Sequence, residues 1–582
     1  MYSSNYDKFP SIPVEGSIWS GWKEILRHLR KNINDSNKEK FILLVECYQG
    51  VNDKELIKGF HSLDPYLFIN TKEIFRPESE IASLTYPDVT DDRVFGYMTR
   101  LTLNDFVDKE KVVELQGEVN KVKGLVIIYG TASSLIIKDP DMIIYADMSR
   151  WELQLRQRKH KICNIGLDNK EESPACQYKR GFFVDWRVCD QNKKRIFGQV
   201  DYWLDTVQEN APKMIDAHTL KLGLEKAVKQ PFRLVPFFDP GPWGGQWMKE
   251  VCNLEKDVPN FAWCFDCVPE ENSLLFKISG QIFELPAVNL VFFKTRELLG
   301  EPVESRFGQE FPIRFDFLDT MGGGNLSLQV HPTTQYIRDN FGMTYTQDES
   351  YYILDAKEDA TVFLGLRKGI DPENMIKDLN DAQLGKIDFD PDRYINRFPA
   401  KKHDHFLIPN GTIHCSGKNC MVLEISATPY IFTFKLWDWK RLGLDGKPRP
   451  INITHGSHVI QWQRDTDYCL NELVSKVEKI GEGDGWLEER TGLHPDEFIE
   501  TRRHLFSKPV EHFTNQSVNV INLVEGREAI VESPDHIFEP FIVHYAETFI
   551  VPANIKRYTI RPYGESVGKQ CMTLKAYIRF KA

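Results

Sequence analysis

The stretch LSLQVHP at residues 326–332 decides how the rest of the chain is interpreted. Its apolar and polar residues alternate, and this pattern predicts a β-strand. Side chains two residues apart on a strand point to the same face, so Gln329 and His331 are expected to lie side by side. One face of this strand then carries an amide and an imidazole.

Two later stretches complete a candidate metal site. Glu349 begins the apolar stretch ESYYILDA, which predicts a second strand, and His414 follows a Pro-Asn-Gly turn before the apolar residues 421–425. An amide oxygen, a carboxylate and two imidazoles that converge inside a small β-barrel, with one position open, suit a divalent ion such as zinc. The alternative is that each histidine is a packed or solvated side chain. The predicted ligands are Gln329, His331, Glu349 and His414.

The three stretches resemble the metal-bearing motifs of class I mannose-6-phosphate isomerases. PWGG at residues 242–245 is similar to the Trp-Gly-Gly entry motif of that family, and FKLWDWKR at residues 434–441 is similar to its Tyr-Arg-Val-Tyr-Asp-Tyr-x-Arg run. The resemblance extends over roughly residues 230–580. It implies a cupin fold with one Zn²⁺ per chain, or another divalent metal, and a sugar phosphate as substrate.

The resemblance also marks Lys435 and Arg441 as catalytic candidates. Lys435 stands where the family has an active-site arginine, and lysine keeps the positive charge but loses the planar, bidentate fork. The family usually has a lysine near the position of Asp316, and the CxxC at residues 264–267 stands in place of an acidic segment, with Asp266 as its only acidic substitute. We expect the CxxC to be structural. The general base stays open, with Asp316 and Lys435 as candidates.

The first part of the chain has a different pattern. Continuous apolar runs at residues 40–47, 124–130 and 141–147 alternate with helical segments, which predicts an α/β domain with a parallel sheet. Their order resembles P-loop kinases of the uridine-kinase type. The loop at residues 46–55, however, has one glycine and no Gly-Lys-Ser/Thr, so a phosphate cradle is missing. The open alternatives are binding of another nucleotide or sugar phosphate, or a degenerate fold kept for packing.

Two details of this domain bear on those alternatives. Asp53 or Lys54, depending on the register, falls where the phosphate-binding lysine should be, and an aspartate there would repel a triphosphate. The helix after the third strand carries Arg150, Arg156 and Arg158, which either meet a phosphate or form an exposed, solvated face.

The last part of the chain is expected to begin with charged helices, at residues 461–491 and 495–505, and to continue as short strands. These strands fit a second small barrel, and they resemble the C-terminal cupin of the same isomerase family. His512 and His544 lack a partner motif, so no metal is expected there.

Composition limits the class of protein. A chain of 582 residues is expected to form two to four domains. Its net charge of −11 and pI near 5.8 argue against partners such as nucleic acid or anionic membranes. The eleven scattered cysteines suit a reducing cytosol, and neither a signal peptide nor an apolar run of ~18 residues is evident, so a cytoplasmic location is predicted.

Together these features predict a multidomain α/β + β protein, in which an N-terminal parallel-sheet α/β domain precedes two cupin-type β-barrels with inserted helices. The predicted domains are residues 1–228, 229–455 and 456–582. The predicted function is metal-dependent interconversion of mannose 6-phosphate and fructose 6-phosphate through a cis-enediol. The alternatives are a non-catalytic, metal-containing sugar-phosphate sensor and an isomerase for a different sugar phosphate. A true kinase would have to bind ATP despite the altered loop, and the oligomeric state is left open.

Overall fold

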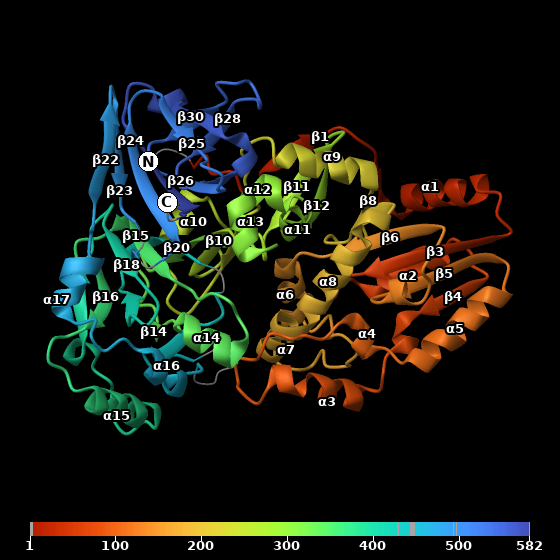
Figure 1. The fold of residues 1–582 in the computed structure, drawn as a ribbon, viewed down its shortest axis with the longest axis horizontal. Helices are drawn as coiled ribbons and strands as arrows, with labels where there is room; N and C mark the ends of the chain where they lie inside the picture. Colours follow the sequence, from red (N-terminus) through yellow and green to blue (C-terminus); the bar gives the residue numbers. More distant parts are fainter. Residues whose placement is uncertain (1–3, 428–429, 443–448, 493, 496, 581–582) are drawn as a thin grey trace. The chain divides into compact units, whose positions relative to one another are not determined.

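A computed structural model describes residues 4–427, 430–442, 449–492, 494–495 and 497–580 (Figure 1). The chain forms two compact units. Unit 1 comprises Met1–Pro10, Ala227–Asn272 and Lys294–Ala582, and unit 2 comprises Ser11–Lys226 and Ser273–Phe293. The chain passes from one unit to the other four times. The passage at 226/227 lies two residues before the predicted border at 228/229, and the other three were not predicted.

Unit 2 is built on a seven-stranded sheet with the order β2-β8-β7-β6-β3-β5-β4. Its strands are β2 (Ile18–Ser20), β3 (Lys40–Cys47), β4 (Leu67–Asn70), β5 (Gly124–Gly130), β6 (Met142–Asp147), β7 (Tyr202–Asp205) and β8 (Lys213–Asp216). The five strands from β4 to β7 in this order are parallel, which confirms the predicted parallel sheet. All six residues of β6 are buried, as expected for a strand covered on both faces.

Helices cover this sheet. They are α1 (Gly21–Asp35), α2 (Asp53–His61), α3 (Glu78–Val89), α4 (Leu103–Phe106), α5 (Lys109–Lys121), α6 (Arg150–Arg158), α7 (Pro174–Arg180), α8 (Trp186–Ile196) and α9 (Ala217–Ala227).

Unit 2 also contains a segment from the middle of the predicted isomerase domain. β11 (Ser273–Ile278) pairs in parallel with β1 (Ser11–Val14) and antiparallel with β12 (Gln281–Pro286). The following helix, α11 (Val288–Phe293), carries the buried Asn289, which donates a hydrogen bond to Asp147 at the end of β6 (2.8 Å). The two units are therefore interlaced along the chain.

In unit 1, two sheets carry the stretches that predicted the metal site. The first has the order β18-β15-β20-β13-β10-β9 and the second has the order β17-β16-β19-β14-β21. The strands of the first are β9 (Phe237–Asp239), β10 (Trp263–Cys267), β13 (Arg314–Asp319), β15 (Glu349–Ala356), β18 (His405–Ile408) and β20 (Cys420–Ser426). Those of the second are β14 (Leu328–Val330), β16 (Thr361–Leu366), β17 (Ile395–Pro399), β19 (His414–Ser416) and β21 (Phe434–Trp437). The pairing of these described strands does not close into a barrel, so the cupin barrel stays a prediction.

Two further sheets of unit 1 form its C-terminal part, with the orders β22-β23-β24-β31-β26-β29 and β25-β30-β27-β28. Their strands are β22 (Glu478–Gly483), β23 (Trp486–Arg490), β24 (Ile499–Phe506), β25 (Val510–Phe513), β26 (Asn519–Glu525), β27 (Glu528–Glu532), β28 (Phe541–His544), β29 (Thr548–Val551), β30 (Arg557–Pro562) and β31 (Cys571–Ile578). The helices predicted for 461–491 and 495–505 are wrong over β22, β23 and β24. Their charged residues instead pair across strands, as Glu489 does with Arg503 (2.7 Å).

The helices of unit 1 are short. They are α10 (Trp247–Val251), α12 (Thr295–Leu299), α13 (Glu301–Phe307), α14 (Thr334–Phe341), α15 (Pro372–Gln383), α16 (Ile453–Val459) and α17 (Thr466–Tyr468). In the described parts of both units, no helix has the length and apolar character needed to cross a membrane.

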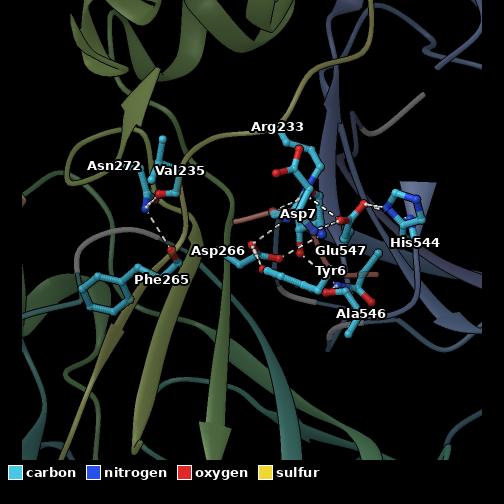
Figure 2. A network of polar contacts seen from close by, with 12 residues as sticks. Tyr6, Asp7, Arg233, Val235, Phe265, Asp266, Asn272, His544, Ala546 and Glu547 are labelled. Carbon is cyan, nitrogen blue, oxygen red and sulfur yellow. Dashed lines mark hydrogen bonds and ion pairs between the residues drawn. The ribbon is translucent and has the colours of Figure 1, made fainter. Parts of the chain in front are cut away.

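A buried ion network fastens the N-terminal residues to unit 1 (Figure 2). The guanidinium of Arg233, 4% exposed, lies 2.7 Å from Glu547 and donates to the backbone carbonyl of Asp7 (2.8 Å). The Asp7 amide donates to the same Glu547 carboxylate (2.6 Å), and the Tyr6 hydroxyl donates to Asp266 (2.8 Å). Since a buried charge is costly unless it is paired, this network makes the N-terminal segment part of the fold of unit 1.

Candidate metal centre

A row of polar residues crosses three neighbouring strands of the second sheet. Gln329 on β14 is the direct cross-strand partner of His414 on β19 and also of Lys435 on β21. Cross-strand partners project from the same face of a sheet, so His414, Gln329 and Lys435 form one row. His331 follows two residues after Gln329 and shares its face. The alternation of LSLQVHP therefore has the predicted result.

Glu349 joins this row from β15 of the other sheet. Its Oε1 lies 2.7 Å from His414 Nε2, and its Oε2 lies 3.1 Å from His331 Nε2. The three side chains are at most 1% exposed, and one ligand atom from each lies within 4.8 Å of the others. The structure thus brings together three of the four predicted ligands in a cluster that could hold a metal ion.

The tautomers of the two histidines fit a cation at this place. His331 Nδ1 lies 3.2 Å from the Phe432 carbonyl, and His414 Nδ1 lies 2.9 Å from the Thr412 carbonyl. A carbonyl only accepts, so each Nδ1 carries a hydrogen, and in the neutral imidazole each Nε2 then presents a lone pair to Glu349. Lone pairs that face a buried carboxylate repel it unless a cation lies between them, and a backbone carbonyl on the second nitrogen is the usual support of a metal-binding histidine.

Glu349 requires positive charge beside it. Burial by itself raises the pKa of Glu349, but positive charge on His331 and His414, with hydrogen bonds from both, opposes it and holds the pKa well below its ordinary value. His331 Nε2 and Glu349 Oε1 are also among the buried atoms without a hydrogen-bond partner. The donor set of two imidazoles and one carboxylate is the one that zinc and similar ions prefer.

Gln329, the fourth predicted ligand, lies beside the cluster. Its Nε2 is 3.1 Å from His414 Nε2, and its Oε1 accepts a hydrogen bond from Ser327 (3.2 Å). The oxygen and nitrogen of an amide are assigned from their neighbours, and a rotation of 180° would turn Oε1 toward His414 Nε2 and the cluster. Gln329 is therefore within reach as a ligand.

One carboxylate of the site, that of Glu424, was not predicted from the sequence. Glu424 on β20, 6% exposed, pairs across strands with Tyr351 on one side and with Asp316 on the other. Gln347 Nε2 donates to Glu349 Oε2 (2.9 Å) and lies 3.5 Å from Glu424 Oε1, so one amide links the two carboxylates. Burial, followed by the charges of Glu349 and Asp316, raises the pKa of Glu424 well above its ordinary value. The available signal was a single glutamate inside the apolar residues 421–425.

Asp316, a candidate base in the sequence, is held by an arginine. Burial raises the pKa of Asp316 to about 7, against the opposing charge of Arg314, with which it forms a buried ion pair. The Arg314 guanidinium also lies over the ring of Tyr430, 4.4 Å from its centre. The charge of Arg314 favours the ionised form of Asp316, so Asp316 is a weaker base than burial alone would make it.

The two catalytic candidates have different surroundings. Lys435 belongs to the row of Gln329 and His414, and burial lowers its pKa to about 8. Arg441 contacts Asp438 (3.4 Å) and donates to the Asn325 carbonyl, and Asp438 also pairs with Arg449 (2.9 Å). Lys435 is thus in register with the candidate centre, and the charges that act on its pKa, Arg449 and Asp438, belong to the same ion cluster that Arg441 contacts.

Asp266 is not the acidic substitute that its place in the sequence indicated. It accepts hydrogen bonds from the Tyr6 hydroxyl (2.8 Å) and the Thr548 amide (2.9 Å) in the network of Figure 2. Its neighbour Phe265 is the cross-strand partner of Asp316, and the register shifts between Phe265 and Cys267, so Asp266 is the extra residue of a bulge and its carboxylate is taken up by Tyr6 and Thr548.

The glycines of the Trp-Gly-Gly stretch have a packing reason. A Cβ on Gly245 would lie 2.0 Å from Asp319 Oδ1 and 2.6 Å from the Met321 amide nitrogen. Asp319 accepts hydrogen bonds from the amides of Met248 (2.8 Å) and Met321 (2.9 Å). The turn therefore closes against a buried carboxylate that leaves room only for glycine.

In unit 2, the altered phosphate loop is held by the protein's own groups. Asp53, the first residue of α2, accepts a hydrogen bond from the Tyr129 hydroxyl (2.6 Å) and pairs with Lys72 (2.8 Å). The Gly50 carbonyl accepts a hydrogen bond from the Arg156 guanidinium (2.8 Å).

The exposed-helix alternative is wrong for Arg150 and Arg156. Each is 3% exposed, and each forms an ion pair, Arg150 with Asp190 (2.5 Å) and Arg156 with Glu152 (2.8 Å). These arginines follow a strand of the parallel sheet, and their inward partners are the buried carboxylate of Asp190 for Arg150 and backbone carbonyls such as that of Gly50 for Arg156.

Parts of the chain are similar to known proteins. Residues 21–229 match a family model described as a domain of unknown function, DUF8485. The chain is 27% identical over 233 residues to mannose-6-phosphate isomerase ManA of Bacillus subtilis, which is 40% of this chain and 68% of that protein. It is 24% identical over 222 residues to mannose-6-phosphate isomerase of Streptococcus mutans, which is 38% of this chain and 64% of that protein.

The crystal structure of mannose 6-phosphate isomerase from Bacillus subtilis matches 60% of this chain and 99% of its own, with 19% sequence identity and a TM-score of 0.49. About two fifths of the chain is thus related in sequence to mannose-6-phosphate isomerases, over about two thirds of their length.

Proposed function

We propose that unit 1 is a metal-dependent aldose–ketose isomerase that interconverts mannose 6-phosphate and fructose 6-phosphate. The observation that carries the proposal is the approach of His331 and His414, through their Nε2 atoms, to the two carboxylate oxygens of Glu349 in a buried cluster that is in register with Lys435. The partial sequence relationship to mannose-6-phosphate isomerases supports the substrate class.

The metal would be held by His331, His414, Glu349 and Gln329, and we propose one Zn²⁺ or a similar divalent ion at this centre. When bound, such an ion orients and polarises sugar oxygens. The ligands come from two sheets, which already bring His331, His414 and Glu349 together, and Gln329 needs only the rotation of its amide to join them.

The proton transfer is assigned to Glu424. Isomerisation moves a proton between C1 and C2 through a cis-enediol, and this requires a carboxyl group close to the sugar with a pKa nearer to neutrality than that of a free glutamate. Glu424 is buried and projects from the same face of its sheet as Glu349, to which Gln347 links it. Glu349 itself is a poor base because both of its oxygens face imidazoles.

The charge of the substrate is assigned to Lys435. By its register Lys435 projects from the face of the ligand row, and its ammonium would pair with the phosphate or with the oxyanion that develops on the enediol. A lysine supplies one point charge where a guanidinium would supply two parallel hydrogen bonds, so we expect weaker substrate binding than an arginine would give.

Two alternatives remain in the same site. The pairing of Asp316 with Arg314 favours a non-catalytic sugar-phosphate sensor, because it withdraws one carboxylate from the chemistry. The replacement of an expected arginine by Lys435 favours a different sugar phosphate as substrate.

For the folds, we infer that the four β-sheets of unit 1 belong to two cupin-type barrels and that unit 2 is a degenerate relative of P-loop kinases. The five parallel strands have the order β4-β5-β3-β6-β7, so β3, the earliest of them along the chain, lies at the centre. This order supports the relationship to P-loop kinases. The contacts of Asp53 and Gly50 support a role other than ATP binding.

Solvent exchange tests the reaction. Mannose 6-phosphate incubated with the protein in D₂O should yield fructose 6-phosphate, with deuterium at the carbon that exchanged its proton, followed by NMR. Binding of the sugar phosphate without product and without exchange would reject the isomerase and support the sensor. Product from another aldose phosphate alone would keep the chemistry and change the substrate.

A further inference from the structure

Two histidines lie together between the two C-terminal sheets. His504 on β24 belongs to the first of these sheets, and His512 on β25 belongs to the second. Their ring centres are 4.4 Å apart, closer than the 5.1 Å that separates His331 and His414, and each residue is 2% exposed. The sequence brings them together because they flank the short connection at residues 507–509.

Both histidines project into the interior between the sheets. His504 pairs across strands with Thr573 on β31, and Thr573 in turn pairs with Leu523, a member of the hydrophobic core between these sheets. His512 pairs with Tyr558, another member of that core, and the two rings are stacked with centres 5.1 Å apart.

Several polar atoms of this group lack a partner. Both ring nitrogens of His512, Nδ1 of His504 and the Thr573 hydroxyl are buried and without a hydrogen bond. A buried polar group left unpaired costs about 1–3 kcal/mol, and a neutral imidazole contributes both a donor and an acceptor. Four such atoms on three neighbouring side chains therefore call for a bound group.

The second nitrogen of His504 is supported as in a metal site. His504 Nε2 lies 3.2 Å from the Glu488 carboxylate, which is itself fixed by Arg502 (2.8 Å). A carboxylate accepts from an imidazole N–H, so Nδ1 of His504 carries the lone pair and turns it into the interior. A carboxylate behind a histidine fixes the tautomer and increases the basicity of the metal-binding nitrogen.

We propose that His504 and His512 bind a transition-metal ion that prefers imidazole, such as Zn²⁺, at a second site separate from the candidate centre around His331. The Thr573 hydroxyl lies beside it as a further oxygen donor. Lys575, two residues along β31 from Thr573 and 6% exposed, has a positive charge that opposes a cation, so the two imidazoles must supply most of the binding. Hard ions such as Mg²⁺ need several carboxylate or carbonyl oxygens, which these groups do not offer, and are therefore excluded from this place.

The test uses the full-length protein with His331→Ala, which removes the first centre and makes the result independent of isomerase activity. After chelation, the protein is dialysed against Zn²⁺, Co²⁺ or Mg²⁺ and its metal content is measured. We expect one Zn²⁺ or Co²⁺ per chain, no Mg²⁺, and loss of this ion in the double variant His331→Ala/His512→Ala. The Co²⁺ form should show visible absorption bands typical of nitrogen ligation.

A second pair of variants covers the case in which replacement of His512 prevents folding. Glu488→Gln should weaken Zn²⁺ binding about 10–100-fold, because it removes the support of His504. Glu489→Gln, the next residue on β23, pairs with Arg503 instead and should leave the affinity unchanged. A His331→Ala protein that holds no ion, so that the group encloses water or an unpaired imidazole contact only, would overturn the proposal. An ion that survives in both the His512→Ala and Glu488→Gln variants would also overturn it.

Discussion

Gln329 and Lys435 are direct cross-strand partners on β14 and β21, and this pairing places a cationic side chain in the same row as the predicted metal ligands. His414 is the partner of Gln329 on its other side. A substrate bound at the metal would thus have an ammonium at one end of the row. The proposed roles of metal and phosphate-binding group both follow from this register.

Lys435 gives the first prediction. In Lys435→Arg, the guanidinium can hold a phosphate with two parallel hydrogen bonds, so we expect kcat/KM to rise severalfold. Lys435→Met keeps most of the side-chain volume without the charge, and its KM for the sugar phosphate should rise by at least about tenfold. Steady-state kinetics of both variants measure this. Equal kinetics for the methionine variant and the parent would show that Lys435 does not contact the substrate.

Glu424 and Glu349 are expected to separate catalysis from metal binding. Glu424→Gln should lower kcat by about 10²–10⁴ while the protein keeps its metal, because a positioned proton carrier contributes about that factor. Glu349→Gln should lose the metal, since it removes the carboxylate that faces both histidines. Metal analysis and kinetics on the same preparations test the pair. A fully active Glu424→Gln protein would refute its assignment.

Gly245 should be intolerant of a side chain. In Gly245→Ala, the new Cβ would overlap Asp319 Oδ1 and the Met321 amide, and overpacking of this kind costs about 1–3 kcal/mol. Gly117→Ala is the matched control: nothing lies within 4 Å of its Cβ in α5, and alanine should stabilise that helix by up to about 1 kcal/mol. Urea unfolding should therefore give changes of opposite sign. A neutral Gly245→Ala would mean that the turn is more open than described.

Glu284 predicts a pH dependence in unit 2. Burial and the nearby Asp205 raise its pKa from 4.5 to about 7. Between these two values the folded state binds more protons than the unfolded chain, so stability falls as the pH rises through this window, by at most about 3 kcal/mol. In Glu284→Gln, the amide oxygen can still accept the hydrogen bond from Ser273, and the loss of stability between pH 4.5 and about 7 should disappear.

Hydrogen exchange of the β12 amides at pH 5 and pH 8 measures this effect. Glu118→Gln, which changes an exposed glutamate of α5, serves as the control and should leave the pH dependence as it is. If Glu284→Gln and the parent lose protection equally between pH 5 and pH 8, Glu284 does not cause the dependence.

Local pattern predicted the parts of the fold that depend on local physics. The alternation of residues 326–332 and the turn before His414 were enough to bring Gln329, His331 and His414 together, and the apolar runs gave the parallel sheet of unit 2. The burial of Arg150 was not predictable in this way, because its partner Asp190 lies 40 residues further along the chain.

The larger errors in the predicted fold also come from contacts between residues that lie far apart in the sequence. Nothing in residues 273–293 indicates that β11 pairs with β1, since the pairing joins segments more than 260 residues apart. β24 appeared helical because its residues are charged, and its true partners, Glu488 and Glu489, lie in a strand that was also predicted as helix. His504 was therefore overlooked, and with it the histidine pair.

Metal-dependent isomerase activity is tested most directly by a coupled assay for conversion of mannose 6-phosphate to fructose 6-phosphate on the full-length protein, first after chelation and then with Zn²⁺ restored. We expect turnover that vanishes with the metal and returns with Zn²⁺ in the parent, but not in His331→Ala. A parent protein that holds one metal ion at the His331 cluster and shows no turnover, or one whose turnover survives chelation, would show that this cluster is not the centre of a metal-dependent isomerase.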